Sequence, residues 1–103
     1  MARLKLNPDP TFFIKAVAIP VPGGESDVGL TFKYRDGPSI AAWLKEHEST
    51  YNVDLVLDCV TGWDLEEEFN REHVQRMCDL YPGAAAAIVT RYLKELSGNR
   101  RGN

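Results

Sequence analysis

The sequence has no long apolar run, and its longest hydrophobic stretches fall far short of the roughly 20 residues that span a bilayer. Residues 1–10 contain Pro8 and Pro10 and lack the apolar centre of a secretory signal peptide. We therefore expect a protein that stays in the cytoplasm, where it is made, without contact to a membrane.

Residues that usually carry catalysis or bind metals are also scarce. Cys59 and Cys78 form no Cys-x-x-Cys motif, which favours buried reduced thiols over a disulfide or a metal site. Neither His47 nor His73 lies at a spacing that pairs it with a nucleophile. Gly23-Gly24 lacks the residues of a phosphate-binding loop. The sequence thus predicts no enzyme activity, no metal and no cofactor.

An excess of positive charge is missing as well. Twelve basic and fifteen acidic residues give a net charge of −3, which disfavours nucleic acid as a partner. Arg100 and Arg101 belong to residues 97–103, which we expect to form a flexible basic tail. The acidic run Glu66–Glu68 lacks the glycine-punctuated pattern of a calcium loop, so it indicates a solvated face or a docking patch for a basic partner.

Two segments near the start have the pattern of β-strands. Residues 12–21 are aromatic and β-branched, and Pro20 places this strand at a sheet edge or close to its end. Residues 28–34 alternate between apolar and polar side chains after a turn cluster at 22–27. We expect an antiparallel hairpin whose buried face consists of Val17, Ile19, Val28, Leu30 and Phe32.

Helical patterns follow the hairpin. Asp36-Gly37-Pro38 starts a first helix, which should end near Ser49. Asn52 can cap a second helix over residues 53–60, although the alternation of this segment also fits a strand. Gly62 suits the stop after it.

Two further helices complete the chain. Asn70 is the expected N-cap of the third, with Phe69 packing on Val74 as a hydrophobic staple. Pro82-Gly83 interrupts that helix and can open a fourth that runs to Leu96. The pattern predicts one α+β domain over residues 1–96, with an N-terminal antiparallel β-hairpin followed by three to four α-helices.

The aromatic side chains exceed what so small a core requires. Most should pack inside the domain, but aromatic residues also dominate protein interfaces, so one or two can serve a partner. The candidate partner-binding residues are Trp43, Trp63, Phe69, Tyr81 and Tyr92.

Several short strings occur in a recognisable order. They are Ile19-Pro20-Val21-Pro22-Gly23-Gly24, Leu30-Thr31-Phe32-Lys33-Tyr34-Arg35, Ala42-Trp43-Leu44, Gly62-Trp63-Asp64-Leu65 and Tyr81-Pro82-Gly83-Ala84. In this order the chain, from about Leu4 to Leu96, resembles the short tail assembly chaperones of long-tailed bacteriophages and prophages.

The resemblance implies a non-virion assembly factor in the cytoplasm of the host bacterium. Such a factor would coat the tape measure protein and keep its long hydrophobic helices soluble until tail tube subunits displace it. Self-association and a longer product made by ribosomal frameshifting are also compatible with this family. The alternative is an unrelated small adaptor or regulator of phage or prophage origin that binds proteins in the same way.

Overall fold

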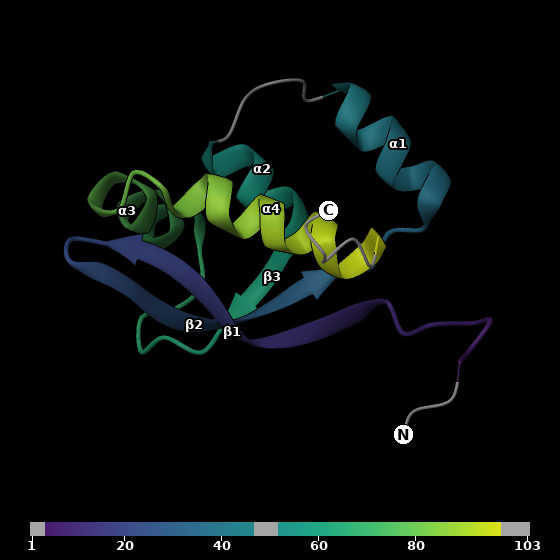
Figure 1. The fold of residues 1–103 in the computed structure, drawn as a ribbon, viewed down its shortest axis with the longest axis horizontal. Coiled ribbons are helices and arrows are strands. Elements are labelled where there is room, and N and C mark those ends of the chain that lie inside the picture. Colours follow the sequence, from purple (N-terminus) through teal and green to yellow (C-terminus); the bar gives the residue numbers. More distant parts are fainter. Residues whose placement is uncertain (1–3, 47–51, 98–103) are drawn as a thin grey trace.

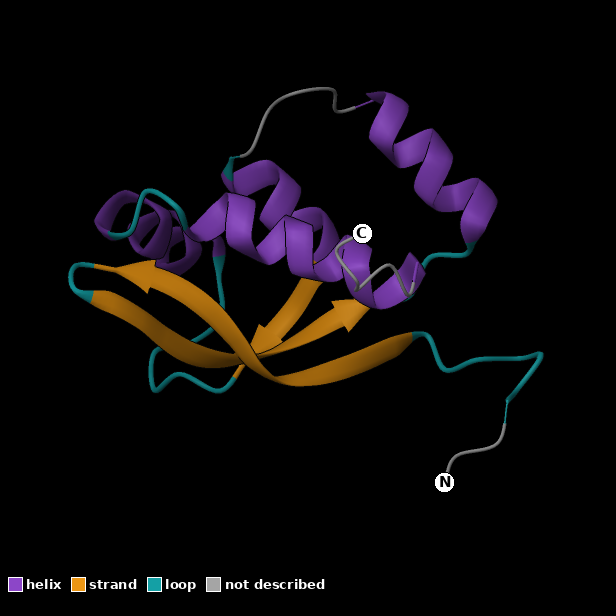
Figure 2. Ribbon diagram, in the orientation of Figure 1, coloured by secondary structure: helices purple, strands orange, loops and turns teal. Residues whose placement is uncertain are grey.

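The computed structural model describes residues 4–46 and 52–97, which form a three-stranded sheet and four helices. The helices lie on one side of the sheet (Figures 1 and 2). In chain order the elements are β1 (Thr11–Val21), β2 (Gly24–Lys33), α1 (Gly37–Glu46), α2 (Val53–Cys59), β3 (Val60–Trp63), α3 (Arg71–Leu80) and α4 (Ala84–Ser97). The predicted α+β class, with a hairpin followed by helices, is confirmed.

The hairpin turns more tightly than the sequence suggested. Val21 pairs with Gly24, so only Pro22 and Gly23 form the turn and the rest of the expected 22–27 loop belongs to β2. Gly23 has φ +87°, and a proline followed by a glycine with positive φ suits a type II turn. Because the turn has only two residues, the two strands pair directly on either side of it.

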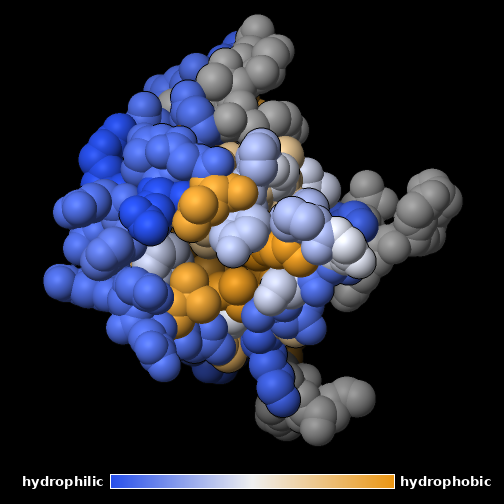
Figure 3. Space-filling model, turned by 90° about the vertical axis from the view of Figure 1, so that its left-hand side faces the viewer, coloured by the Kyte–Doolittle hydropathy of each residue, from blue (hydrophilic) through white to orange (hydrophobic). Residues whose placement is uncertain are grey.

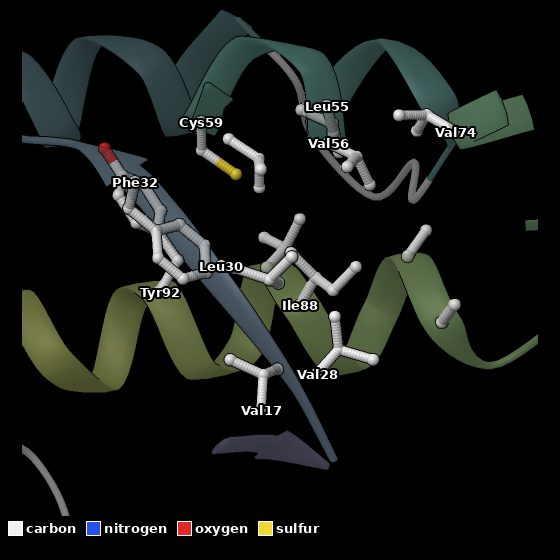
Figure 4. Close-up of a cluster of buried hydrophobic side chains, with 14 of the residues drawn as sticks. Val17, Val28, Leu30, Phe32, Leu55, Val56, Cys59, Val74, Ile88 and Tyr92 are labelled. Atoms are coloured by element: carbon white, nitrogen blue, oxygen red, sulfur yellow. The ribbon is translucent and has the colours of Figure 1, made fainter. Parts of the chain in front are cut away.

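The predicted buried face of the hairpin is confirmed. Its five residues are at most 9% exposed, and they pack against residues of α2 and α4 that include Val56 and Ile88 (Figure 4). The sheet order β1-β2-β3 makes β1 an edge strand, which is where Pro20 is tolerated. The core therefore lies between the sheet and the helices.

Segment 53–63 contains both a helix and a strand. Asn52 caps α2 as expected, since its Oδ1 accepts a hydrogen bond of 3.2 Å from the Leu55 amide. The helix ends at Cys59, one residue before the predicted end, and the chain continues as β3, which we did not predict. Gly62 is therefore not a helix stop but pairs with Thr31 of β2. The free edge of β2 provides these pairing partners, and no local pattern could indicate them.

The remaining helices begin at the predicted signals. Asp36 accepts a hydrogen bond of 3.0 Å from the Ser39 amide at the start of α1, and Asn70 accepts one of 2.8 Å from the His73 amide at the start of α3. The expected end of the first helix near Ser49 and the residue His47 lie outside the described residues. So do residues 98–103 of the expected tail, whereas Ser97 is the last residue of α4.

Candidate binding groove

An apolar groove of about 290 Å³ opens at the end of the molecule that holds the hairpin turn and α3. Figure 3 views this end directly and shows hydrophobic side chains gathered between hydrophilic ones. The lining residues are Ile19, Val21, Ser26, Val28, Trp63, Leu65, Glu67, His73, Arg76, Met77, Leu80 and Tyr81. We call this feature the hairpin–α3 groove.

The sheet supplies the deepest part of the groove. Ile19 and Val28 face the helices and are 2% and 9% exposed, so they belong both to the core and to the groove floor. The tight turn at Pro22-Gly23 keeps the two strands paired up to this end. The floor is therefore apolar and consists of paired strands.

A second wall comes from the connection between β3 and α3, which is fixed to the sheet at its first residue. The Asp64 amide donates to the Gly29 carbonyl oxygen at 3.0 Å, and the Gly29 amide donates to Asp64 Oδ1 at 2.9 Å. A Cβ atom at Gly29 would lie 2.6 Å from Asp64 Oδ2, so the close approach requires glycine. We call this pair the Gly29–Asp64 clamp.

The indole of Trp63 shapes the same wall. Its Nε1 donates to the Glu67 carbonyl oxygen at 2.7 Å, which ties the acidic segment to the indole. Phe69 packs edge-to-face on Trp63 with ring centroids 5.2 Å apart. This is the aromatic contact of Phe69 in the structure, and the expected staple between Phe69 and Val74 stays a prediction.

Helix α3 forms the third wall. The Asn70 cap fixes its start, and His73 Nδ1 lies 2.7 Å from the Glu68 carbonyl oxygen. A carbonyl oxygen only accepts, so Nδ1 carries the proton in this arrangement. Met77 is 8% exposed at the base of the wall, whereas Leu80 is 56% exposed at its edge.

The rim carries charge of both signs, from Glu67 and Arg76. Within the described residues, no three histidine, cysteine or acidic side chains gather as a metal site would require. Burial raises the pKa of Cys59 to about 12, which keeps that thiol protonated and unreactive at neutral pH. What the groove offers is apolar surface with polar groups at the edge, an arrangement suited to binding.

The five candidate partner-binding residues divide into two groups. Trp43 and Tyr92 are core residues, 5% and 0% exposed, and lie away from the groove. Trp63 and Tyr81 are half-buried and line the groove, whereas Phe69 packs on Trp63 and does not line the groove itself. The groove thus brings together two of the five.

Sequence reasoning missed several groove residues, above all Leu65, Arg76 and Leu80. Leu80 follows Met77 by three positions on α3, so it extends the apolar stripe of that helix by one turn. This helical spacing could have identified Leu80 from the sequence. Leu65 gave none, because its position depends on the clamp that holds the connection against β2.

The fold and the groove together define a small α+β domain with a surface suited to an apolar peptide. A family model described as phage tail assembly chaperone matches residues 1–103. The chain therefore belongs to the phage tail assembly chaperone family, as its resemblance to that family indicated. This membership points to a non-catalytic role and to protein partners in tail assembly. Comparisons with curated proteins and with solved structures gave no match. Across the described segments, no helix has the length and apolar character to cross a membrane.

Proposed function

We propose that this chain binds apolar helical segments of the tape measure protein in the hairpin–α3 groove and keeps that partner soluble in the host cytoplasm. Tail tube subunits then displace the chain as they polymerise around the tape measure protein. The observation that carries the proposal is an open apolar groove on a member of a tail assembly chaperone family.

The physical basis is helix-in-groove recognition. One apolar face of a partner helix would lie against the exposed lining residues Leu65 and Leu80, above the floor, while polar groups at the rim remain in contact with water. Methionine and leucine side chains adapt to different partner surfaces, which suits a chaperone that binds many segments of one long protein. No chemical step is needed, so the proposed role is that of a binding protein and not of an enzyme.

Trp63 and Tyr81 are the partner-binding aromatics in this proposal. Each presents part of a large apolar ring at the groove, and such rings contribute much of the binding energy at protein interfaces. Trp43 and Tyr92 act indirectly by holding the core together.

Co-expression with the tape measure protein encoded nearby tests the proposal. Leu80→Glu places a charge at the groove edge and should abolish co-purification and leave the tape measure protein in the insoluble fraction. Leu44→Glu, on a leucine of α1 that is 42% exposed and does not line the groove, is the matched control and should behave like the parent chain. Equal capture by both variants, or no capture by the parent chain, would refute the proposal.

A further inference from the structure

Strand β1 is an edge strand, and within the described residues one side of its backbone pairs with no other strand. Val21 and Gly24 close the two-residue turn as a hydrogen-bonded pair, and hydrogen-bonded and non-hydrogen-bonded pairs alternate from there. Ala18, opposite Asp27, falls at a non-hydrogen-bonded pair, so its N–H and carbonyl groups point away from β2. Pro20 lies at the next outward position and offers only a carbonyl oxygen, because proline has no N–H. This edge is therefore open to a further strand.

A cleft of about 500 Å³ lies along this open edge, between β1 and the helix α4 that packs beside it. We call it the β1–α4 cleft. Its lining includes Ala18 and Pro20 from the strand and the small side chains of Ala86, Ala87 and Thr90 from the helix. It shares no lining residue with the hairpin–α3 groove, so the two are separate surfaces.

Two contacts bound the open stretch of the edge. Near the hairpin turn, Gly83 lies against Pro20, and a Cβ atom on that glycine would be 3.2 Å from the proline ring. At the other end, Arg91 Nη1 donates to the Ala16 carbonyl oxygen at 3.0 Å, where the register between β1 and β2 shifts. The stretch between these contacts is centred on Ala18 and suits a short extended peptide.

Charge in the cleft differs between its two ends. Glu25 pairs with Pro20 near the hairpin turn, whereas Arg91 and Lys94 lie in the C-terminal half of α4. Arg91 already binds Glu95 Oε2 at 2.9 Å. Lys94 is exposed and makes no ion pair with any residue that the structure describes. A carboxylate at this end would therefore gain a counterion without breaking an existing pair.

We propose that the β1–α4 cleft binds an extended acidic segment of a partner protein, which adds as an antiparallel strand beside β1. Its backbone pairs with Ala18, and an apolar side chain lies against Ala86 and Ala87. An antiparallel strand runs from the Glu25 end of the cleft toward the Lys94 end, so the carboxylate lies on the C-terminal side of the paired stretch. Strand addition at an exposed sheet edge is a general mode of peptide recognition.

Charge favours a different protein over this chain as the source of the segment. The acidic run Glu66–Glu68 is tied to Trp63, whose Nε1 donates to the Glu67 carbonyl oxygen at 2.7 Å. Residues 98–103 carry two arginines and no acidic residue, so Lys94 would repel them. Because the cleft and the hairpin–α3 groove are separate, this inference does not rest on the proposed function.

Selection from a library of random heptapeptides tests the proposal, with the full parent chain as bait. Enriched sequences should carry aspartate or glutamate on the C-terminal side of an apolar or β-branched stretch. Lys94→Glu as bait should reverse the preference to lysine or arginine, whereas Lys45→Glu, on α1, should select the same sequences as the parent. Absence of enrichment, or an acidic preference that survives Lys94→Glu, would overturn the inference.

The most enriched acidic peptide, made synthetically, then reports where it binds. In fluorescence anisotropy, Thr90→Tyr should weaken its binding at least about tenfold, because the added ring fills the cleft. Gln75→Tyr, at an exposed position of α3 outside the cleft, is the matched control and should bind like the parent. Circular dichroism checks that both variants are folded. Equal binding by Thr90→Tyr and the parent would contradict the proposed site.

Hydrogen exchange measures the strand addition itself. A saturating concentration of the peptide should slow exchange of the Ala18 amide at least about tenfold, because that N–H then donates to the added strand. An Ala18 amide that exchanges at the same rate with and without peptide would rule out pairing at this edge. If the parent chain associates in sedimentation and Thr90→Tyr alone abolishes the association, a second copy occupies the cleft and the inference is wrong.

The groove variant separates this inference from the proposed function. Leu80→Glu alters the hairpin–α3 groove and leaves the β1–α4 cleft intact, so it should bind the acidic peptide like the parent. If the parent binds the peptide but captures no tape measure protein, the proposed function fails and the cleft assignment stands. The opposite pattern rejects the cleft assignment alone.

Discussion

Tyr92 is the residue around which the core is organised. Its hydroxyl donates to the Lys33 carbonyl oxygen at 2.8 Å and accepts from Arg35 Nη1 at 3.0 Å. Its ring stacks on Phe32 with centroids 5.3 Å apart and meets Trp43 edge-on at 5.8 Å. Burial raises the pKa of Tyr92, as it raises that of Cys59, and the two groups share a core that favours their neutral forms.

Stability should therefore fall at alkaline pH, with Cys59 as a main cause. Burial raises the pKa of Cys59 to about 12 in the folded chain, from an ordinary value of 9.0. The buried thiol contributes its full stabilisation below about pH 9. Above this pH the free energy of unfolding falls by about 1.4 kcal/mol per pH unit up to the folded pKa, because the unfolded chain loses the thiol proton first. Between about pH 8 and about pH 10, the free energy of unfolding measured in urea should fall by about 1 kcal/mol less for Cys59→Ala than for the parent chain. Equal losses would contradict this explanation.

Single residues were predictable where a repeating pattern marks one face. The alternation in the two strands identified Phe32 and the other buried residues of the hairpin. The aromatic residues could not be sorted in this way, because a helical period shows which side of Trp43 or Tyr81 is apolar but not which other element covers that side. Tertiary packing decides whether such a ring becomes core or surface.

Among the elements, the connection between β3 and α3 depends most on one contact, the Gly29–Asp64 clamp. We predict that Gly29→Ala lowers the free energy of unfolding by about 1–3 kcal/mol, because the added methyl group displaces Asp64 from its hydrogen bonds. Gly24→Ala is the matched control, since a Cβ atom there meets nothing within 4 Å, and it should change stability by less than about 0.5 kcal/mol. Urea denaturation measures both.

The same substitution should weaken the groove, because Trp63 and Leu65 flank the clamp. The fluorescence of Trp63 reports this directly, and a Trp43→Phe background removes the second indole. A Gly29→Ala chain with unchanged stability and an unchanged Trp63 spectrum would show that the clamp does not hold the wall.

Caps were predictable at the scale of elements, and the third strand was not. Asn52 and Asn70 act within three residues of themselves, so their sequence signals are local. Strand β3 has four residues and exists because the end of α2 brings Val60 beside Phe32. The connection it anchors, and with it half of the groove, was therefore beyond sequence reasoning.

For the whole molecule, the balance of forces at the groove sets how its complexes respond to salt. The lining is mostly apolar and the rim carries charge of both signs, so ionic screening should cost little. Raising salt from about 50 to about 200 mM should weaken the complex with the tape measure protein by less than about tenfold, whereas a protein bound to phosphates loses about a thousandfold or more. Pull-down across a salt series measures this, and a steep dependence would point to an electrostatic partner.

Helix α1 stands apart from the other helices (Figure 2), and Trp43 is its one buried residue. That indole donates to Asp58 Oδ2 at 3.2 Å and lies under the guanidinium of Arg35, whose carbon is 4.8 Å from the ring centroid. An element with a single buried side chain opens at a lower free energy than the strands beside it. Backbone amides of α1 should therefore exchange with deuterium well before those of β2, in local excursions that leave the sheet intact.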